Sequence, residues 1–199
     1  MTTLYCATGN AGKLREFQMA ADRAPFAIDL LPGYKALPPA VEDGATFEEN
    51  AVKKALHYRP HSAGLLFADD SGLEVDALGG APGVYSARFS GPHATDASNN
   101  QLLLNKLRGI ADRNARFVCA IALVDRDRIL GVWRGAVEGT ILDAPRGAGG
   151  FGYDPLFFCP AFGCTFGEAA AEQKLSLSHR GQAFRAMVDW WSTTQLLRR

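Results

Sequence analysis

The order of strand-like and helix-like segments at the amino terminus restricts the fold more than any other feature of this sequence. Residues 3–8 form a short apolar run typical of a buried strand, and residues 26–31 form a second one. Between them, residues 13–21 place Leu14 and Phe17 on one face of a helix, directly after a turn that contains two glycines. Strand, turn, helix and strand in this order predict an α/β domain.

A second helix is marked by the segment Thr46-Phe47-Glu48-Glu49. This is a capping box, in which Thr46 accepts a hydrogen bond from the Glu49 amide while the Glu49 side chain reaches back. We interpret Glu48 and Glu49 as charges that favour the start of a helix ending near Tyr58. Residues 64–70, just beyond it, are expected to form a strand.

The remaining expected elements follow from alternating and helical patterns farther along the chain. They are a hairpin of residues 116–125 and 129–137 around the polar turn 125–128, a glycine-rich loop at 146–154, a strand at 156–159, and a helix from His179 to Trp191 that buries Phe184, Met187 and Val188. We see no linker or repeat, and the length suits one domain, residues 1–199, or a domain with a smaller lobe.

Composition excludes several classes of function. The 21 basic and 21 acidic residues balance, so no overall positive field exists to attract a nucleic acid or an anionic membrane. No apolar run approaches the roughly 18 residues of a membrane span, and the first residues do not resemble a signal peptide. We therefore expect a cytoplasmic chain without nucleic-acid or membrane partners. Cys6 and Cys119 alternate with apolar residues and are expected in the core.

The turn after the first strand, Thr8-Gly9-Asn10-Ala11-Gly12-Lys13, has the composition of a phosphate-binding loop. Its glycines allow close approach of a ligand, the helix that follows offers free amides and a positive dipole, and Lys13 adds a charge. The spacing differs from the Walker A motif, which has four residues between its first glycine and Gly-Lys. An ordinary tight turn therefore remains an alternative.

Two adjacent carboxylates, Asp69 and Asp70, end the apolar run of residues 64–68 before the alternation resumes at Leu73. Like charges at a buried strand end repel each other, so we expect a metal ion to balance them. Because neighbouring side chains of a strand point to opposite sides, one carboxylate should face a cleft at the strand's end and the other should make a structural hydrogen bond. Carboxylates nearby in sequence, Glu42 among them, suit Mg²⁺ completed by substrate phosphates.

Cationic and aromatic residues late in the chain suit a purine base and its phosphates. Lys174 is placed to meet phosphate, close to the expected start of the last helix. Arg180 has the forked geometry that matches O6 and N7 of a 6-oxopurine. His179 fits a ligand contact and a structural role equally well. Phe151 or Tyr153 suits stacking on a base, with internal packing as the alternative.

Six segments, in order along nearly the whole chain, resemble the inosine triphosphate pyrophosphatase family. They are Thr8–Lys13, Glu42–Ala51, Ala68–Leu73, Leu78–Arg88, Gly150–Pro155 and Ser178–Ala183. The resemblance implies an elongated α/β fold with a mixed sheet and flanking helices, in a single domain, residues 1–199, with two lobes around a central nucleotide-binding cleft. It also implies a homodimer that hydrolyses ITP, dITP and XTP, with Mg²⁺, to the monophosphate and pyrophosphate. For residues 78–91 the resemblance leaves three roles open: the segment shapes the cleft, forms dimer contacts, or is simply a rigid loop.

Residue roles follow from the same resemblance. Asp70 is implied as the general base and a metal ligand, and Glu42 as a second metal ligand. The implied substrate contacts are Thr8, Gly9, Asn10, Ala11, Gly12, Lys13, Ser71, Phe151, Gly152, Tyr153, Asp154, Lys174, His179 and Arg180.

Three alternatives stay open at this stage. A nucleoside triphosphatase or kinase would act at the γ-phosphate and release or transfer it. A nucleotide-binding module would bind without turnover. A related pyrophosphatase would prefer another base.

Overall fold

The computed structural model describes residues 2–126 and 128–196. The chain divides into two compact units. The first comprises the residues up to 70, residues 119–135 and the residues from 179 onward, and the second comprises residues 71–118 and 136–178.

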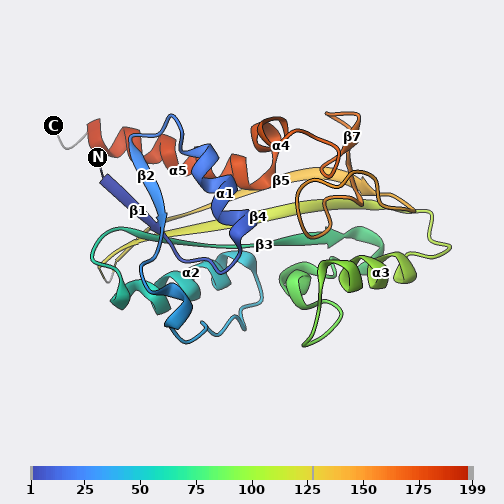
Figure 1. Cartoon of the computed structure of the whole chain (residues 1–199), viewed down its shortest axis with the longest axis horizontal. Helices are drawn as coiled ribbons and strands as arrows, with labels where there is room; N and C mark the ends of the chain where they lie inside the picture. The colour runs from blue at the N-terminus through green and yellow to red at the C-terminus, as the bar shows by residue number, and fades with distance from the viewer. Residues whose placement is uncertain (1, 127, 197–199) are drawn as a thin grey trace. The chain divides into compact units, whose positions relative to one another are not determined.

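A seven-stranded sheet is the framework of the fold, in the order β2-β1-β3-β4-β5-β6-β7 (Figure 1). The strands are β1 (Thr2–Cys6), β2 (Phe26–Leu30), β3 (Leu66–Val75), β4 (Asn114–Asp125), β5 (Arg128–Ile141), β6 (Phe157–Cys159) and β7 (Cys164–Thr165). Strand β1 is parallel to both β2 and β3, whereas β6 is antiparallel to β5 and β7. The sheet is therefore mixed, as expected for this α/β fold.

Helices flank the sheet. They are α1 (Ala11–Ala20), α2 (Phe47–Tyr58), α3 (Asp96–Lys106), α4 (Ala171–Leu177) and α5 (His179–Leu196). Within the first unit, α1 and α5 lie on one face of the sheet and α2 lies on the other (Figure 1). Short 3₁₀ helices are formed by Tyr34–Ala36, Arg59–His61, Asp76–Leu78 and Gly83–Arg88.

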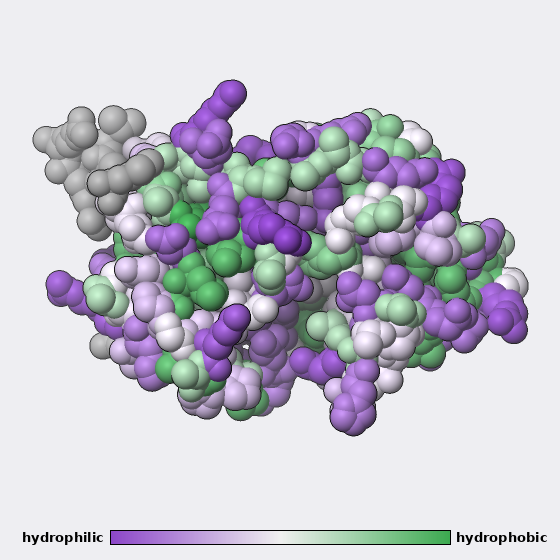
Figure 2. Space-filling model, in the orientation of Figure 1, coloured by the Kyte–Doolittle hydropathy of each residue, from purple (hydrophilic) through white to green (hydrophobic). Residues whose placement is uncertain are grey.

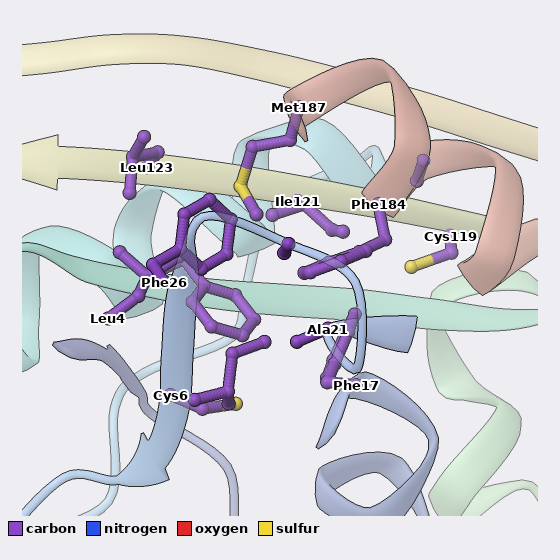
Figure 3. Close-up of a cluster of buried hydrophobic side chains, with 14 residues drawn as sticks. Leu4, Cys6, Phe17, Ala21, Phe26, Cys119, Ile121, Leu123, Phe184 and Met187 are labelled. Atoms are coloured by element: carbon purple, nitrogen blue, oxygen red, sulfur yellow. The ribbon is translucent and has the colours of Figure 1, made fainter. Parts of the chain in front are cut away.

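The first unit has an aromatic core between β1, β2, α1 and α5 (Figure 3). The Phe17 ring meets Phe67 edge-on at 5.0 Å between centroids, and Phe184 packs on Phe17 at 6.0 Å. Cys6 and Cys119 are buried in the same core as free thiols, which confirms the packing role expected for them. This core anchors the start of α1, from which the predicted phosphate loop extends.

The second unit has its own core. Phe117, Phe157 and Phe166 pack together, with centroids 4.7 Å apart for the first two and 5.0 Å apart for the last two. Leu103 of α3 and Leu73 of β3 are fully buried in this cluster. The core therefore joins α3 to the sheet strands of its unit.

The expected elements are present, with several differences. Thr46 accepts from the Glu49 amide at 3.1 Å, as predicted, but the Glu49 carboxylate accepts from the Ala45 amide at 2.8 Å. The hairpin of β4 and β5 is confirmed, although Asp127 of its turn lies outside the described residues. Helix α3 was not expected, and Lys174 lies in the separate helix α4, not at the start of the last helix.

The face visible in Figure 2 is largely hydrophilic, with hydrophobic residues in small patches. Among the residues described, no helix has the length and apolar character needed to cross a membrane.

Candidate active site

Asp69 and Asp70 lie within strand β3, because the strand continues without a break to Val75. The expectation of a strand end at this point is therefore wrong. Both carboxylates are buried, with exposed fractions of 1% and 6%. The fold accommodates these two buried carboxylates because cations and amides of the first unit surround them.

Asp69 forms an ion pair with Lys13 of α1, with 2.9 Å between Nζ and Oδ2. Its backbone carbonyl also accepts from Nζ of Lys54 at 3.0 Å. Burial by itself would raise the pKa of the Asp69 carboxyl, but the cations of Lys13, Arg180 and Lys54 outweigh that effect and lower the pKa below 3.8. Asp69 therefore stays ionised and connects β3 to α1 and α2.

Asp70 accepts a hydrogen bond from the Asn50 amide, with 3.0 Å between Nδ2 and Oδ2. Asn50 is fully buried, and its Oδ1 accepts from the Gly44 amide at 2.8 Å. Burial raises the pKa of the Asp70 carboxyl above 3.8, in spite of the opposing cations of Lys13 and Lys54. A buried carboxylate of raised pKa has the character of a general base.

Lys54 connects the β3 carboxylates to the segment before α2. Its Nζ lies 3.0 Å from Oε1 of Glu42, and the lysine is 8% exposed. Burial would lower the pKa of Lys54, but the carboxylates of Asp69, Glu42 and Asp70 raise it, so the ammonium stays charged. The site thus contains a buried positive charge beside Asp70.

Neither Lys54 nor Asn50 was identified from the sequence. A signal was nevertheless present. The buried face of α2 consists of Phe47, Asn50, Ala51, Lys54, Ala55 and Tyr58. An asparagine and a lysine on an otherwise apolar helix face are unusual unless they have buried partners.

The predicted phosphate loop is ordered by its own asparagine. Oδ1 of Asn10 accepts from the amides of Gly12 at 2.8 Å and Lys13 at 3.0 Å, as a helix N-cap. The backbone N–H of Asn10 donates in turn to Oγ1 of Thr8 at 3.2 Å. The expectation of free amides is therefore wrong at these two positions, since asparagine is among the best N-cap residues.

Arg180 and His179, at the start of α5, are both buried, with 2% and 3% exposed. The Arg180 guanidinium pairs with Glu16 and lies over the Phe17 ring at 5.7 Å. Burial opposes its charge, but the carboxylate of Glu16 outweighs this and raises the pKa of Arg180. In this structure Arg180 thus connects α5 to α1, and a contact with a base stays a prediction.

The chemistry of the carboxylates fits Mg²⁺. Asp70 and Glu42 offer hard oxygen donors, and each lies in the electrostatic field of the other. No group of three or more Asp, Glu, His or Cys side chains that could hold a metal occurs in the described part of the chain. Mg²⁺ is usually held by one or two carboxylates and completed by substrate phosphates, and Asp70 and Glu42 are the carboxylates that would hold it.

The second unit holds the glycine-rich loop, whose Phe151 or Tyr153 was expected to stack on the base, and Lys174, which was expected to meet phosphate. Oδ2 of Asp154 accepts from the Phe151 amide at 2.9 Å and pairs with Nζ of Lys174 at 2.5 Å. Lys174 is 4% exposed and lies over the Phe151 ring at 4.9 Å. Asp154, Lys174 and Phe151 therefore form one cluster, although 20 residues separate the ion pair in sequence.

Tyr153 is 4% exposed, and its hydroxyl donates to the Ser86 carbonyl at 2.8 Å. This geometry favours the packing alternative over stacking on a base. Oγ of Ser86 also accepts from the Leu73 amide of β3 at 2.9 Å. The segment around Ser86 thus packs on β3 just after the half-buried Ser71, which favours the rigid-loop alternative for residues 78–91.

Comparison with known proteins decides the family. The model of the Ham1 family matches residues 4–190. The chain belongs to the Ham1 family. Among relatives of this Ham1-family chain, the dITP/XTP pyrophosphatase of Exiguobacterium sp. is 48% identical over 184 residues, which are 92% of this chain and 94% of the relative. The dITP/XTP pyrophosphatase of Geobacter sulfurreducens is 48% identical over 192 residues, 95% of this chain and 96% of the relative.

Solved structures agree with this family membership. A HAM1 protein from Coxiella burnetii superposes with a TM-score of 0.86 at 37% identity, over 97% of this chain and 100% of that one. The Staphylococcus aureus Ham1 protein gives a TM-score of 0.85 at 36% identity, with the same coverage. The resemblance recognised in the sequence is therefore confirmed.

Proposed function

We propose that this chain hydrolyses the oxopurine nucleoside triphosphates ITP, dITP and XTP to the monophosphate and pyrophosphate. The relatives named dITP/XTP pyrophosphatase, at 48% identity over nearly the whole chain, support the reaction and the substrate class. The observation that carries the proposal is the buried Asp70, a carboxylate of raised pKa beside the cation of Lys54.

In the proposed mechanism, Asp70 orients a water molecule toward the α-phosphorus and accepts its proton. Asn50 donates to Oδ2 of the Asp70 carboxylate at 3.0 Å, which fixes the orientation of the carboxylate toward the water. A new bond forms between the water oxygen and the α-phosphorus, the bond from this phosphorus to the bridging oxygen breaks, and pyrophosphate leaves. Positioning and charge stabilisation account for most of the acceleration.

Cations of the first unit offset the charge that develops. Lys54 and Lys13 are assigned to the phosphates, together with the loop of residues 8–12. Asp70 and Glu42 would hold a divalent ion, which would supply Lewis acidity at the phosphates. Mg²⁺ is the ion that these donors suit best.

Residues of both units are assigned as contacts of the base and of the rest of the substrate, and each unit is described separately. In the second unit we assign Ser71 and the cluster of Phe151, Gly152, Tyr153, Asp154 and Lys174, in which Phe151 is the stacking side chain and Tyr153 supports the loop. In the first unit we assign His179 and Arg180. A homodimer and a cytoplasmic location complete the proposal.

The product pattern tests this function. Purified chain is incubated with Mg²⁺ and ITP, dITP, XTP, GTP or ATP, and pyrophosphate and orthophosphate are measured separately. The expected result is pyrophosphate from ITP, dITP and XTP, with little product from GTP and ATP. Orthophosphate alone would place the attack at the γ-phosphorus, and nucleotide binding without any product would indicate a binding module. Either result would contradict the proposal.

A further inference from the structure

Both backbone hydrogen-bonding groups of Gly152 are bound by side chains of one helix. Its N–H donates to Oδ2 of Asp96 at 2.7 Å, and its carbonyl accepts from Nδ2 of Asn100 at 3.0 Å. Asp96 and Asn100 are four residues apart on α3, so they project from the same face of the helix. The two contacts span more than 50 residues of sequence, and no motif recognised in the sequence includes Asn100.

The loop at Gly152 needs such support, because its backbone is irregular. Gly150 and Gly152 both have left-handed φ angles, 72° and 61°. A Cβ atom at Gly150 would lie 2.0 Å from Oδ2 of Asp154, so the loop folds tightly over that carboxylate. Glycine loses more conformational freedom on ordering than any other residue, so contacts from outside the loop add to the bond that the Phe151 amide makes to Asp154 within it.

Helix α3 is a rigid base for these contacts. Thr95 and Ser98 form a capping box at its start. Asn99, which is 4% exposed, accepts from the Ser90 amide at 2.8 Å, and Leu103 is fully buried in the second core. The positions of Asp96 and Asn100 are therefore fixed by packing that does not involve the loop.

Stability alone gives little reason for an asparagine at position 100. Its Oδ1 is buried and lacks a hydrogen-bond partner among the described residues. An unsatisfied buried acceptor is unfavourable and cancels much of what the bond to Gly152 contributes. What the side chain does provide is a fixed orientation for the Gly152 carbonyl.

We propose that Asp96 and Asn100 are positioning residues for base recognition. They fix the backbone of Gly152 and, through it, the position of the adjacent Phe151 ring. The role rests on the proposed function, in which the loop of residues 151–154 contacts the base. Neither residue touches the nucleotide itself. Loss of either contact leaves the hydrolytic groups of the first unit unchanged and weakens binding of the base.

The positioning contacts are tested first without any substrate. We compare N100L, which keeps the branched shape of the side chain and removes its amide, and D96A with the control Q101A, an exposed α3 residue whose side chain donates to Asn105 within the helix. Amide hydrogen exchange is measured for the peptide covering residues 147–154 in unliganded protein, with thermal unfolding to verify folding. Exchange should rise roughly tenfold in N100L and D96A and not in Q101A, because a lost contact raises local opening. Unchanged exchange would overturn the proposal.

Kinetics then tests the consequence for the base. KM for ITP should rise about fivefold in N100L, which loses a neutral hydrogen bond, and about tenfold in D96A, which loses a charge-assisted one. At saturation kcat should stay within about twofold of the parent, since the lost binding is common to ground and transition states. D96N keeps an acceptor oxygen and should recover most of the lost affinity.

The two proposals fail in distinguishable ways. If the parent turns over ITP normally and the variants raise exchange without raising KM, the positioning role is wrong while the function stands. If the parent hydrolyses no oxopurine triphosphate, the function is wrong, and the positioning role in base recognition falls with it. A fall in kcat at unchanged KM would place Asp96 and Asn100 in the chemical step and would also contradict the inference.

Discussion

At the scale of single residues, Asp70 differs from its neighbour Asp69 in the direction of its pKa shift, which is upward for Asp70 and downward for Asp69. It is 6% exposed, and one of its oxygens is held by the amide of Asn50. Burial raises its pKa, which is the direction that suits the general base proposed for this position. The sequence showed the paired aspartates. It could not show which aspartate would have its pKa lowered by nearby cations and which would have its pKa raised by burial.

Asp70→Asn is expected to lower kcat by about 10² to 10⁴-fold, the range for loss of a general base. KM should change much less, because asparagine fills the same space and the cations stay in place. Steady-state kinetics with ITP measures both constants. The matched control is Asp43→Asn, since Asp43 is exposed and pairs with Lys53 at the surface. Near-normal turnover in the Asp70 variant would remove this residue from the chemistry.

Lys13→Met tests the ion pair with Asp69 through the pH dependence of stability. The pKa of Asp69 is lowered in the folded chain, so its contribution to stability is present above pH 3.8 and is lost as the pH falls through the folded value. The variant should lose about 3 kcal/mol at pH 7, because a buried charge loses its partner. This loss should shrink below pH 3.8, as urea unfolding at several pH values can show. The control is Lys53→Met, which removes an exposed ion pair and should have little effect on stability. A loss in Lys13→Met that is equal at every pH would contradict the assigned ion pair with Asp69.

At the scale of elements, β3 shows why the site was only partly predictable. Alternation suggested a strand that ends at the aspartates, but the strand continues because tertiary contacts satisfy its later half. The Leu73 amide donates to Oγ of Ser86, and the Val75 amide donates to the Ala81 carbonyl at 3.2 Å. Such partners from a distant segment leave no periodic signal. Helix α3 was missed for a related reason, since Asn99 and Asn100 interrupt its apolar face.

Gly72→Ala is the test of this close packing. A Cβ atom at Gly72 would lie 2.3 Å from Oγ of Ser86 and 2.5 Å from the Gly83 carbonyl, so the segment must move. We expect a loss of about 1 to 3 kcal/mol in the free energy of unfolding, measured in urea. Gly64→Ala is the matched control, because its Cβ would meet Tyr5 at an ordinary 3.8 Å. Equal stability of the two variants would contradict the close packing.

At the scale of the whole molecule, the sequence predicted the fold class and both ends of the chain well. The first and last helices have regular apolar faces, and their burial on Phe17, Phe184 and Met187 is confirmed. Residue chemistry pointed to the loop of residues 8–13, the paired aspartates and Lys174, and the family resemblance added the individual roles. Lys54, Asn50 and Asp96 act through partners far away in sequence, and only the folded chain brings these groups together.

Metal removal tests the assignment of Asp70 and Glu42 as ligands. Chelation should abolish hydrolysis of ITP, and Mg²⁺ should restore it, because the phosphates complete the coordination of the ion. Glu42→Gln should raise the Mg²⁺ concentration needed for half-maximal activity about tenfold, while kcat at saturating Mg²⁺ is largely kept. An unchanged Mg²⁺ requirement would exclude Glu42 from the metal site.

The position of attack is the central claim, and one isotope experiment tests it directly. ITP is hydrolysed in water enriched in ¹⁸O, and the monophosphate and pyrophosphate are analysed separately by mass spectrometry. Attack on the α-phosphorus predicts one ¹⁸O atom in the monophosphate and none in the pyrophosphate. Label in the pyrophosphate would place the attack on the β-phosphorus and would contradict the mechanism derived from Asp70.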